Sequence, residues 1–354
     1  MRAGWVTENG FRWPDDVYVI PFGDQERIPT GDPINRLTRP AGNFTSECGK
    51  IQRAMKLVCA LTVLVCAASG QTPVTSNLWA PKPDKAPVYI PPHKPLTKLA
   101  DVKAAHAGKS NWRQVVVDDN VLHGEWISSA PGTKVPKCLH PDTRTFWIIQ
   151  EGQIRFDIEG QEPFTASKGW IVQVPFQTFF SMETVGDQPS LRWEVNIGHA
   201  HTLYANEADA PPMEGYHWMN VKMARRPGLY KWENKPYRTY DELAKLTEEK
   251  HAPLHVVQDD RGVGNFLYGY AKNLPPINEA DNGHYHPESC EFWLIMSGQI
   301  RYKIEGQGVY IANPGDVVYV PPFTFHAPRW YSEGASCRFA MNGYPDIAHL
   351  FETK

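Results

Sequence analysis

Short stretches in which apolar and polar residues alternate recur along this chain. In residues 154–158 and 300–304, every second side chain is isoleucine or aromatic, and the side chains between them are charged. A period of two is typical of a β-strand with one buried face. Residues 171–174 and 317–320 are short valine-rich runs that each stop at a proline. The pattern predicts many short strands joined by tight turns, and therefore an all-β sandwich or barrel.

The same strand pattern occurs twice. Residues 145–161 and 291–307 are identical at eleven of 17 positions, at an offset of 146 residues. The same offset relates Gly169 to Gly315. Self-similarity of this kind indicates one structural unit present in two copies. We therefore expect two β-barrels, joined by a linker in which Thr239 and Glu242 form a capping box before a short helix.

These patterns predict the following organisation. In chain order the expected parts are an upstream extension without a fold (1–54), a signal peptide (55–70), a proline-rich arm lying across a barrel (71–110), a first barrel (111–200), a linker with the short helix (201–250) and a second barrel (251–354).

One apolar run resembles a targeting signal, although it is not at the start of the chain. Lys56 is followed by twelve residues without a charge, 57–68, and then by small residues up to Gly70. This is the order of a secretory signal peptide. The alternative is a buried internal helix. The first interpretation makes Met55 the initiator and places the mature protein, beginning near Gln71, in the periplasm or outside the cell.

Composition narrows the function classes. Hydrophobic residues make up 42% of the chain and charged residues 21%, as in ordinary globular proteins, and the net charge is −3. No excess of positive charge exists for nucleic acid. Twelve apolar residues cannot span roughly 30 Å of hydrocarbon, so an integral membrane protein is not expected. Cys138, Cys290 and Cys337 follow residue 70, which permits at most one disulfide bond.

Candidate chemistry lies in the second copy. His284 and His286 are two residues apart, so on a strand both point to the same face. Glu291 opens the next predicted strand, and His326 lies on a later one. Three imidazoles and a carboxylate are ligands for one divalent first-row metal ion per chain, although they do not distinguish Fe, Mn, Ni, Cu or Zn. The alternative is a few surface histidines.

These residues resemble the motifs of the cupin family. The first cupin motif is His-x-His followed by Glu and then Gly, here His284, His286, Glu291 and Gly298, with the proline after the second histidine that germin-like cupins show. The second motif, Gly-Pro-His, is present as Gly315, Pro321 and His326.

The resemblance covers about 112–198 and 252–345 and implies two jelly-roll barrels that pair within the chain. It departs from the family at Phe323, where a glycine is usual, and at Trp330, often an asparagine. Because cupins host many reactions and also non-enzymatic binders, the resemblance indicates a fold more strongly than an activity.

The first copy lacks most of the motif. At the offset of 146, the four ligand positions hold one histidine and three other residues: Cys138, His140, Thr145 and Phe180. Cys138 and His140 could bind a soft metal, but Phe180 would fill the space. We therefore expect a degenerate first site in a structural barrel.

The resemblance implies a small-molecule ligand or substrate, and a metalloenzyme is favoured over a binding protein. A dioxygenase-type oxidoreductase acting on an oxygenated or aromatic compound is the first hypothesis. A Mn-dependent decarboxylase or an isomerase is the second, and needs a proton donor from a loop such as 279–281. The third is a non-catalytic protein that binds a sugar or organic acid through the metal. Homo-oligomerisation is left open.

Aromatic residues near the motifs are further candidates, with core packing as the alternative for each. By strand parity, Tyr302 and Trp293 should face inward, whereas the facing of Tyr319 is open. The candidates beside the ligands are Tyr302 and Tyr319, and those for substrate binding are Trp293, Phe323, Phe325 and Trp330.

Overall fold

The structure is a computed structural model that describes residues 76–231, 233–345 and 347–353. The predicted upstream extension (1–54), the signal peptide (55–70) and the first residues of the arm lie outside the described residues. Export to the periplasm or the medium therefore stays a prediction.

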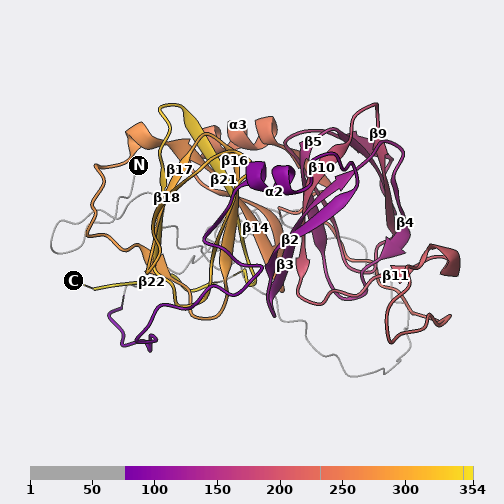
Figure 1. The fold of residues 1–354 in the computed structure, drawn as a ribbon, viewed down its shortest axis with the longest axis horizontal. Helices are drawn as coiled ribbons and strands as arrows, with labels where there is room; N and C mark the ends of the chain where they lie inside the picture. Colours follow the sequence, from indigo (N-terminus) through magenta and orange to yellow (C-terminus); the bar gives the residue numbers. More distant parts are fainter. Residues whose placement is uncertain (1–75, 232, 346, 354) are drawn as a thin grey trace, which may run out of the picture. The chain divides into compact units, whose positions relative to one another are not determined.

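The first copy folds into two antiparallel sheets that face each other (Figure 1). The six-stranded sheet has the order β12-β8-β5-β10-β3-β2, and the five-stranded sheet has the order β11-β4-β9-β6-β7. Their strands are β2 (Trp112–Asp118), β3 (Leu122–Ser129), β4 (Lys134–Leu139), β5 (Thr145–Glu151), β6 (Gln153–Ile158), β7 (Phe164–Ala166), β8 (Trp170–Val174), β9 (Phe180–Val185), β10 (Ser190–Ile197), β11 (Leu203–Tyr204) and β12 (Tyr237–Thr239).

The second copy repeats this arrangement. Its sheets have the orders β1-β19-β16-β21-β14-β13 and β18-β17-β20-β15-β22. Their strands are β1 (Leu96–Thr97), β13 (Leu254–Asp259), β14 (Gly262–Tyr270), β15 (His284–Tyr285), β16 (Glu291–Ser297), β17 (Ile300–Ile304), β18 (Gly308–Ala312), β19 (Val317–Val320), β20 (His326–Trp330), β21 (Ala335–Asn342) and β22 (Leu350–Phe351). The predicted all-β fold of two barrels is confirmed.

Four short helical segments complete the described structure: α2 (Leu99–Ala105), η1 (Glu207–Asp209), α3 (Tyr240–Lys250) and η2 (Ala271–Asn273). The helix α3 begins where the capping box lies: the Thr239 hydroxyl accepts a hydrogen bond from the Glu242 amide at 3.2 Å. Its C-cap, His251, has a φ of 53°, the left-handed conformation that terminates many helices.

A shared core joins the two barrels. Residues from both six-stranded sheets form one buried hydrophobic cluster. Within it, the Phe146 and Phe339 rings lie 6.0 Å apart, and the Trp193 and Phe292 rings lie 6.2 Å apart. These side chains alternate with others that fill each barrel, so each six-stranded sheet has two buried faces. The barrels therefore pair within the chain through their larger sheets.

Each barrel also receives its edge strand from a segment outside its own copy of the repeat. The arm contributes β1, which pairs with β19 of the second barrel, and the linker contributes β12, which pairs with β8 of the first. A helix follows each of these strands: α2 after β1 and α3 after β12. The arm and the linker thus occupy equivalent positions on opposite barrels.

Two glycines make room for these exchanged segments. A β-carbon on Gly315 would lie 2.5 Å from Leu99 of α2, and one on Gly169 would lie 3.0 Å from Tyr240 of α3. Both glycines also have a φ above 80°, a conformation that side chains rarely adopt. The repeat of Gly169 at Gly315 therefore reflects the same docking contact made twice.

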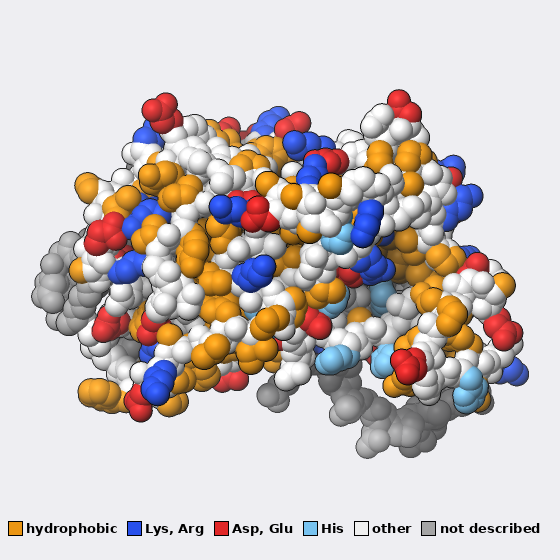
Figure 2. Space-filling view, in the orientation of Figure 1, with side chains coloured by type: hydrophobic (Ala, Val, Ile, Leu, Met, Phe, Trp, Pro, Cys, Tyr) orange, Lys and Arg blue, Asp and Glu red, His pale blue; other side chains and the backbone are white. Residues whose placement is uncertain are grey.

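The described surface carries both signs of charge, and the described cysteines form no disulfide bond. On the face drawn in Figure 2, positive and negative side chains are interspersed. Within the described residues, no helix is long and apolar enough to cross a membrane. Cys138, Cys290 and Cys337 are all buried free thiols, so packing rather than a disulfide holds the described fold together.

Candidate metal centre

The structure brings the four predicted ligands together inside the second barrel. His284 lies on β15, His286 follows it, Glu291 begins β16 and His326 begins β20. One nitrogen or oxygen of each lies within 4.8 Å of the corresponding atoms of the others. The register pairs His284 directly with His326 across the sheet. His286, Glu291 and His326 are 2%, 7% and 0% exposed, so the cluster faces the barrel interior.

Hydrogen bonds fix which imidazole nitrogens face the centre. Nδ1 of His286 donates to the Ala348 carbonyl at 2.8 Å, and Nδ1 of His326 donates to the Thr324 carbonyl at 2.9 Å, because a carbonyl can only accept. In a neutral ring, each Nε2 then carries a lone pair. Both Nε2 atoms face the same Glu291 oxygen, at 2.8 and 3.3 Å.

Three acceptor atoms facing one another repel unless a cation lies among them. The Nε2 atom of His326 is buried and has no hydrogen-bond partner among the described residues, and an unpaired buried polar atom is costly. A divalent metal ion satisfies all three acceptors at once, and backbone hydrogen bonds at the opposite nitrogens are usual for metal-bound histidines. The donor set therefore fits a metal ion.

The electrostatics of the cluster agree with this in part. Burial by itself would lower the pKa of His286, but the hydrogen bond and the charge of Glu291 raise it above its ordinary value, so a metal ion would replace a proton between these two side chains. Burial by itself would raise the pKa of Glu291, but His286 and His326 hold it well below its ordinary value. Burial lowers the pKa of His284 well below its usual range, and the neighbouring histidines lower it further. The carboxylate is thus ionised and His284 neutral, the protonation states that metal ligation requires.

Two of the predicted aromatic residues, Trp293 and Tyr302, pack together next to the ligand His326. The Trp293 ring lies 5.2 Å from that of His326 and 5.1 Å from that of Tyr302. Tyr302 is fully buried and its hydroxyl has no hydrogen-bond partner within the described residues. Burial raises the pKa of Tyr302 above its ordinary value. Its hydroxyl therefore stays protonated and can donate but not act as a base at neutral pH.

The structure places Tyr319 and Trp330 away from the cluster. Tyr319 belongs to the core between the barrels, where its hydroxyl lies 3.4 Å from Asp119 and its ring stacks on His93. The side chain alternation along β19 turns it away from the ligands. Trp330 is buried four residues beyond His326 on β20, against Arg338, so it packs further along the barrel instead of lining a mouth.

The rings of Phe323 and Phe325 both have Tyr285 as a neighbour. The Phe325 ring lies 5.0 Å from that of Tyr285, with the Lys82 ammonium 5.2 Å above it. Phe325 precedes His326, so the two side chains leave opposite faces of the chain. Phe323 has a φ of 62°, and its amide donates to the His286 carbonyl. The cupin motif usually has a glycine at this position, and glycine adopts such a left-handed conformation readily. Phe323 adopts it here, in the loop between Pro322 and His326.

Sequence reasoning missed one imidazole. The His349 ring lies 4.7 Å from that of His284 and 4.6 Å from that of His286. It comes from the C-terminal segment, beyond both sequence motifs, and nothing in its local pattern points to the site. Pairing between β22 and β15 brings it there.

The corresponding positions of the first barrel are filled differently. Cys138 pairs with Phe180 in the sheet register, and the Phe180 ring lies 5.7 Å from that of His140. His140 donates to the His201 carbonyl, and the Thr145 hydroxyl donates to Val195. Burial raises the pKa of the Cys138 thiol to about 12, which disfavours the thiolate that binds metals.

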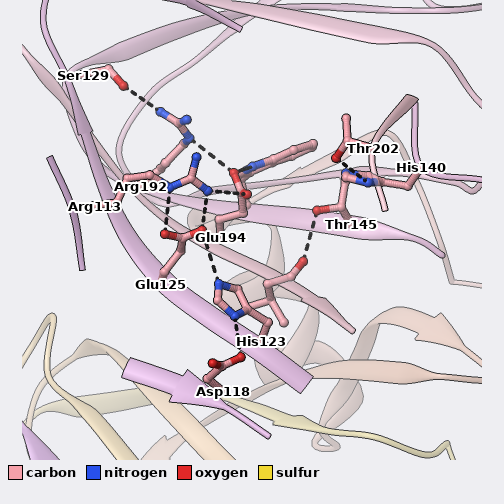
Figure 3. Close-up of polar contacts among 12 residues, drawn as sticks. Arg113, Asp118, His123, Glu125, Ser129, His140, Thr145, Arg192, Glu194 and Thr202 are labelled. Carbon is pink, nitrogen blue, oxygen red and sulfur yellow. Dashed lines mark hydrogen bonds and ion pairs between the residues drawn. The ribbon is translucent and has the colours of Figure 1, made fainter. Parts of the chain in front are cut away.

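Another polar network occupies the first barrel (Figure 3). Arg113 donates to Glu125 through two nitrogens, and His123 lies between Glu125 and Asp118. The Trp147 indole donates to Glu194 at 2.6 Å. Each carboxylate in this network already has a donor or cation beside it. The carboxylates are therefore paired within the network, which fits a structural role.

This network predicts acid sensitivity. Burial would raise the pKa of Glu125, but hydrogen bonds from Arg113 and His123 lower it from 4.5 to about 2. A lowered folded-state pKa contributes stability above the ordinary value, and that stability is lost as the pH falls from about 4.5 towards 2. Glu125→Gln should flatten this part of the stability curve measured by urea unfolding. An unchanged slope would show that Glu125 does not control it.

Fold and site together define a two-barrel β-protein with a buried cluster of metal-ligand type. Residues 273–341 match the family model described as a cupin domain. That segment contains all four cluster residues. No curated protein matches the chain.

Solved structures resemble most of the chain. A salicylate 1,2-dioxygenase from Pseudaminobacter salicylatoxidans has a TM-score of 0.54 at 13% identity, covering 88% of this chain and 100% of that one. A mutant of the salicylate 1,2-dioxygenase in complex with gentisate has a TM-score of 0.53 at 12% identity, covering 89% and 99%. At such identities the likeness concerns the fold. With the domain match, it supports a cupin fold.

Proposed function

We propose that this chain is a metal-dependent dioxygenase-type oxidoreductase that acts on a small oxygenated or aromatic compound. The observation that carries the proposal is the set of His284, His286, Glu291 and His326, whose ligand atoms converge within 4.8 Å of one another inside the second barrel. The similar structures named as salicylate 1,2-dioxygenases support the choice of reaction class.

The four side chains would hold one divalent metal ion. When bound, a redox-active metal with one or two open positions would supply Lewis acidity and O₂ activation. Fe, Mn and Cu fit that chemistry, whereas Zn and Ni would favour a lyase, an isomerase or a binding protein.

The surrounding residues would orient the substrate and exclude water. The Trp293 ring packs against that of His326, so a planar substrate would contact an apolar side chain there. The Tyr302 hydroxyl, buried and unpaired, would donate a hydrogen bond to a substrate oxygen. Glu279, one candidate loop acid for a decarboxylase, instead binds Arg301 at 2.8 Å, which favours the dioxygenase over that alternative.

Metal analysis and oxygen uptake test the proposal. The purified protein should contain Fe, Mn or Cu, and should consume O₂ with at least one member of a panel that includes salicylate, gentisate, catechol and a non-aromatic 1,2-diketone. Glu291→Gln should abolish the uptake. A protein that carries Zn or Ni, consumes no O₂ and still binds a sugar or organic acid would contradict the proposal and favour the binding protein.

A further inference from the structure

The last strand of the chain is built into the candidate metal centre. β22 pairs with β15, the strand that carries His284, and the register places Phe351 opposite His284 and Leu350 opposite Tyr285. Outside the strand, the Asn282 amide donates to Glu352 at 3.1 Å. Residues 347–353, here called the C-terminal strap, therefore lie directly against the segment that supplies two ligands.

The strap holds one ligand in position through its backbone. The Ala348 carbonyl accepts the hydrogen bond from Nδ1 of His286, and this leaves Nε2 of the same ring directed at Glu291. A partner of this kind fixes the tautomer and the orientation of a metal-binding histidine, and its loss typically weakens metal affinity by about 10–100-fold. Since the acceptor is a carbonyl group, no side-chain substitution at position 348 removes it.

The strap also covers the cluster with a side chain. His349 is exposed, whereas His286, Glu291 and His326 are buried. Its ring contacts both His284 and His286, and its Nδ1 donates to the Ile347 carbonyl at 3.1 Å, which fixes the ring. His349 is not one of the four converging ligands. The His349 ring lies on the solvent side of His284 and His286.

We propose that the C-terminal strap is a working part of the metal centre: Ala348 orients His286, and the His349 ring covers the side from which small molecules reach the metal. The inference rests on the metal-binding part of the proposed function but not on its reaction. It makes position 349 a determinant of which chelating molecules enter, with a planar bidentate molecule displacing the ring more readily than a bulky one.

Metal release tests the two roles separately. The full chain is loaded with Co²⁺, and its dissociation constant and its rate of transfer to excess EDTA are measured. His349→Ala removes the side chain of an exposed residue, so folding and the dissociation constant should change little, while transfer to EDTA should be faster than in the wild type. A chain ending at Pro345 should also bind Co²⁺ about tenfold more weakly. His217→Ala, at another exposed histidine, and a chain ending at Phe351, which keeps β22, are the controls.

The outcomes separate this inference from the proposed function. If His349→Ala transfers Co²⁺ at the wild-type rate, the ring does not cover the metal and that role is refuted. If the chain ending at Pro345 is folded by circular dichroism and keeps wild-type affinity, the orienting role is refuted. A wild-type protein that binds no Co²⁺ would overturn the metal centre and the strap together, whereas normal metal binding without O₂ uptake overturns only the dioxygenase.

Discussion

Replacing His326 by alanine is expected to reduce the metal content from about one ion per chain to nearly none. His326 is 0% exposed and its Nε2 atom converges on Glu291 without a hydrogen bond. Its removal leaves three ligands, His284, His286 and Glu291. Because the barrel has its own apolar core, the protein should still fold, unlike a domain that depends on its metal. Elemental analysis of purified protein, with thermal unfolding alongside, measures both effects.

His140→Ala is the matched control for this experiment. His140 occupies the position in the first barrel that corresponds to His286, and it donates to the His201 carbonyl beside Phe180. Its replacement should leave the metal content near one ion per chain. Two ions per wild-type chain, or loss of metal in His140→Ala, would show that the first barrel binds metal as well.

Phe339→Ala is expected to cause a large loss of stability through the shared core. Phe339 is fully buried, between the barrels, and its ring lies 6.0 Å from that of Phe146. Removing a buried phenylalanine side chain typically costs about 3–5 kcal/mol, through lost burial and the cavity that remains. Urea unfolding should show this loss in a single transition, because the core cluster includes residues of both barrels.

Val309→Ala provides the comparison on the surface. Val309 is 49% exposed on β18, so its truncation should change the unfolding free energy by less than about 0.5 kcal/mol. If Phe339→Ala were equally mild, or if the barrels unfolded in two separate transitions, the shared core would not be what couples them.

Local sequence carries much of the fold because its signals are short-range. Alternation in residues 154–158 and 300–304 predicts strands, and β6 and β17 are found there. The capping box at Thr239 predicts the start of α3 for the same reason: the bond joins residues three positions apart. The four-ligand set can also be predicted from the sequence, since His284, His286 and Glu291 are close together and His326 belongs to the second cupin motif.

Only the tertiary structure shows in which direction each aromatic side chain points. Trp293 and Tyr302 face the ligands as strand parity predicts. Tyr319 faces the core between the barrels instead. Each six-stranded sheet is buried on both faces, so an aromatic residue fits on either face and the sequence does not show which. The sequence does not fix the neighbours of Phe325, whose ring lies 5.0 Å from that of Tyr285.

The amino-acid sequence by itself determined that this protein repeats one β-barrel unit and that only the second copy retains a full set of metal-type ligands. Repeats, strand periods and ligand identities are properties of residue order. Only the tertiary structure decided that the arm and the linker exchange edge strands between barrels, and that His349 and the Ala348 carbonyl join the centre from the C-terminal segment. Those contacts join residues 60 or more positions apart in the chain, where pairing depends on the geometry of the assembled sheets and leaves no local pattern.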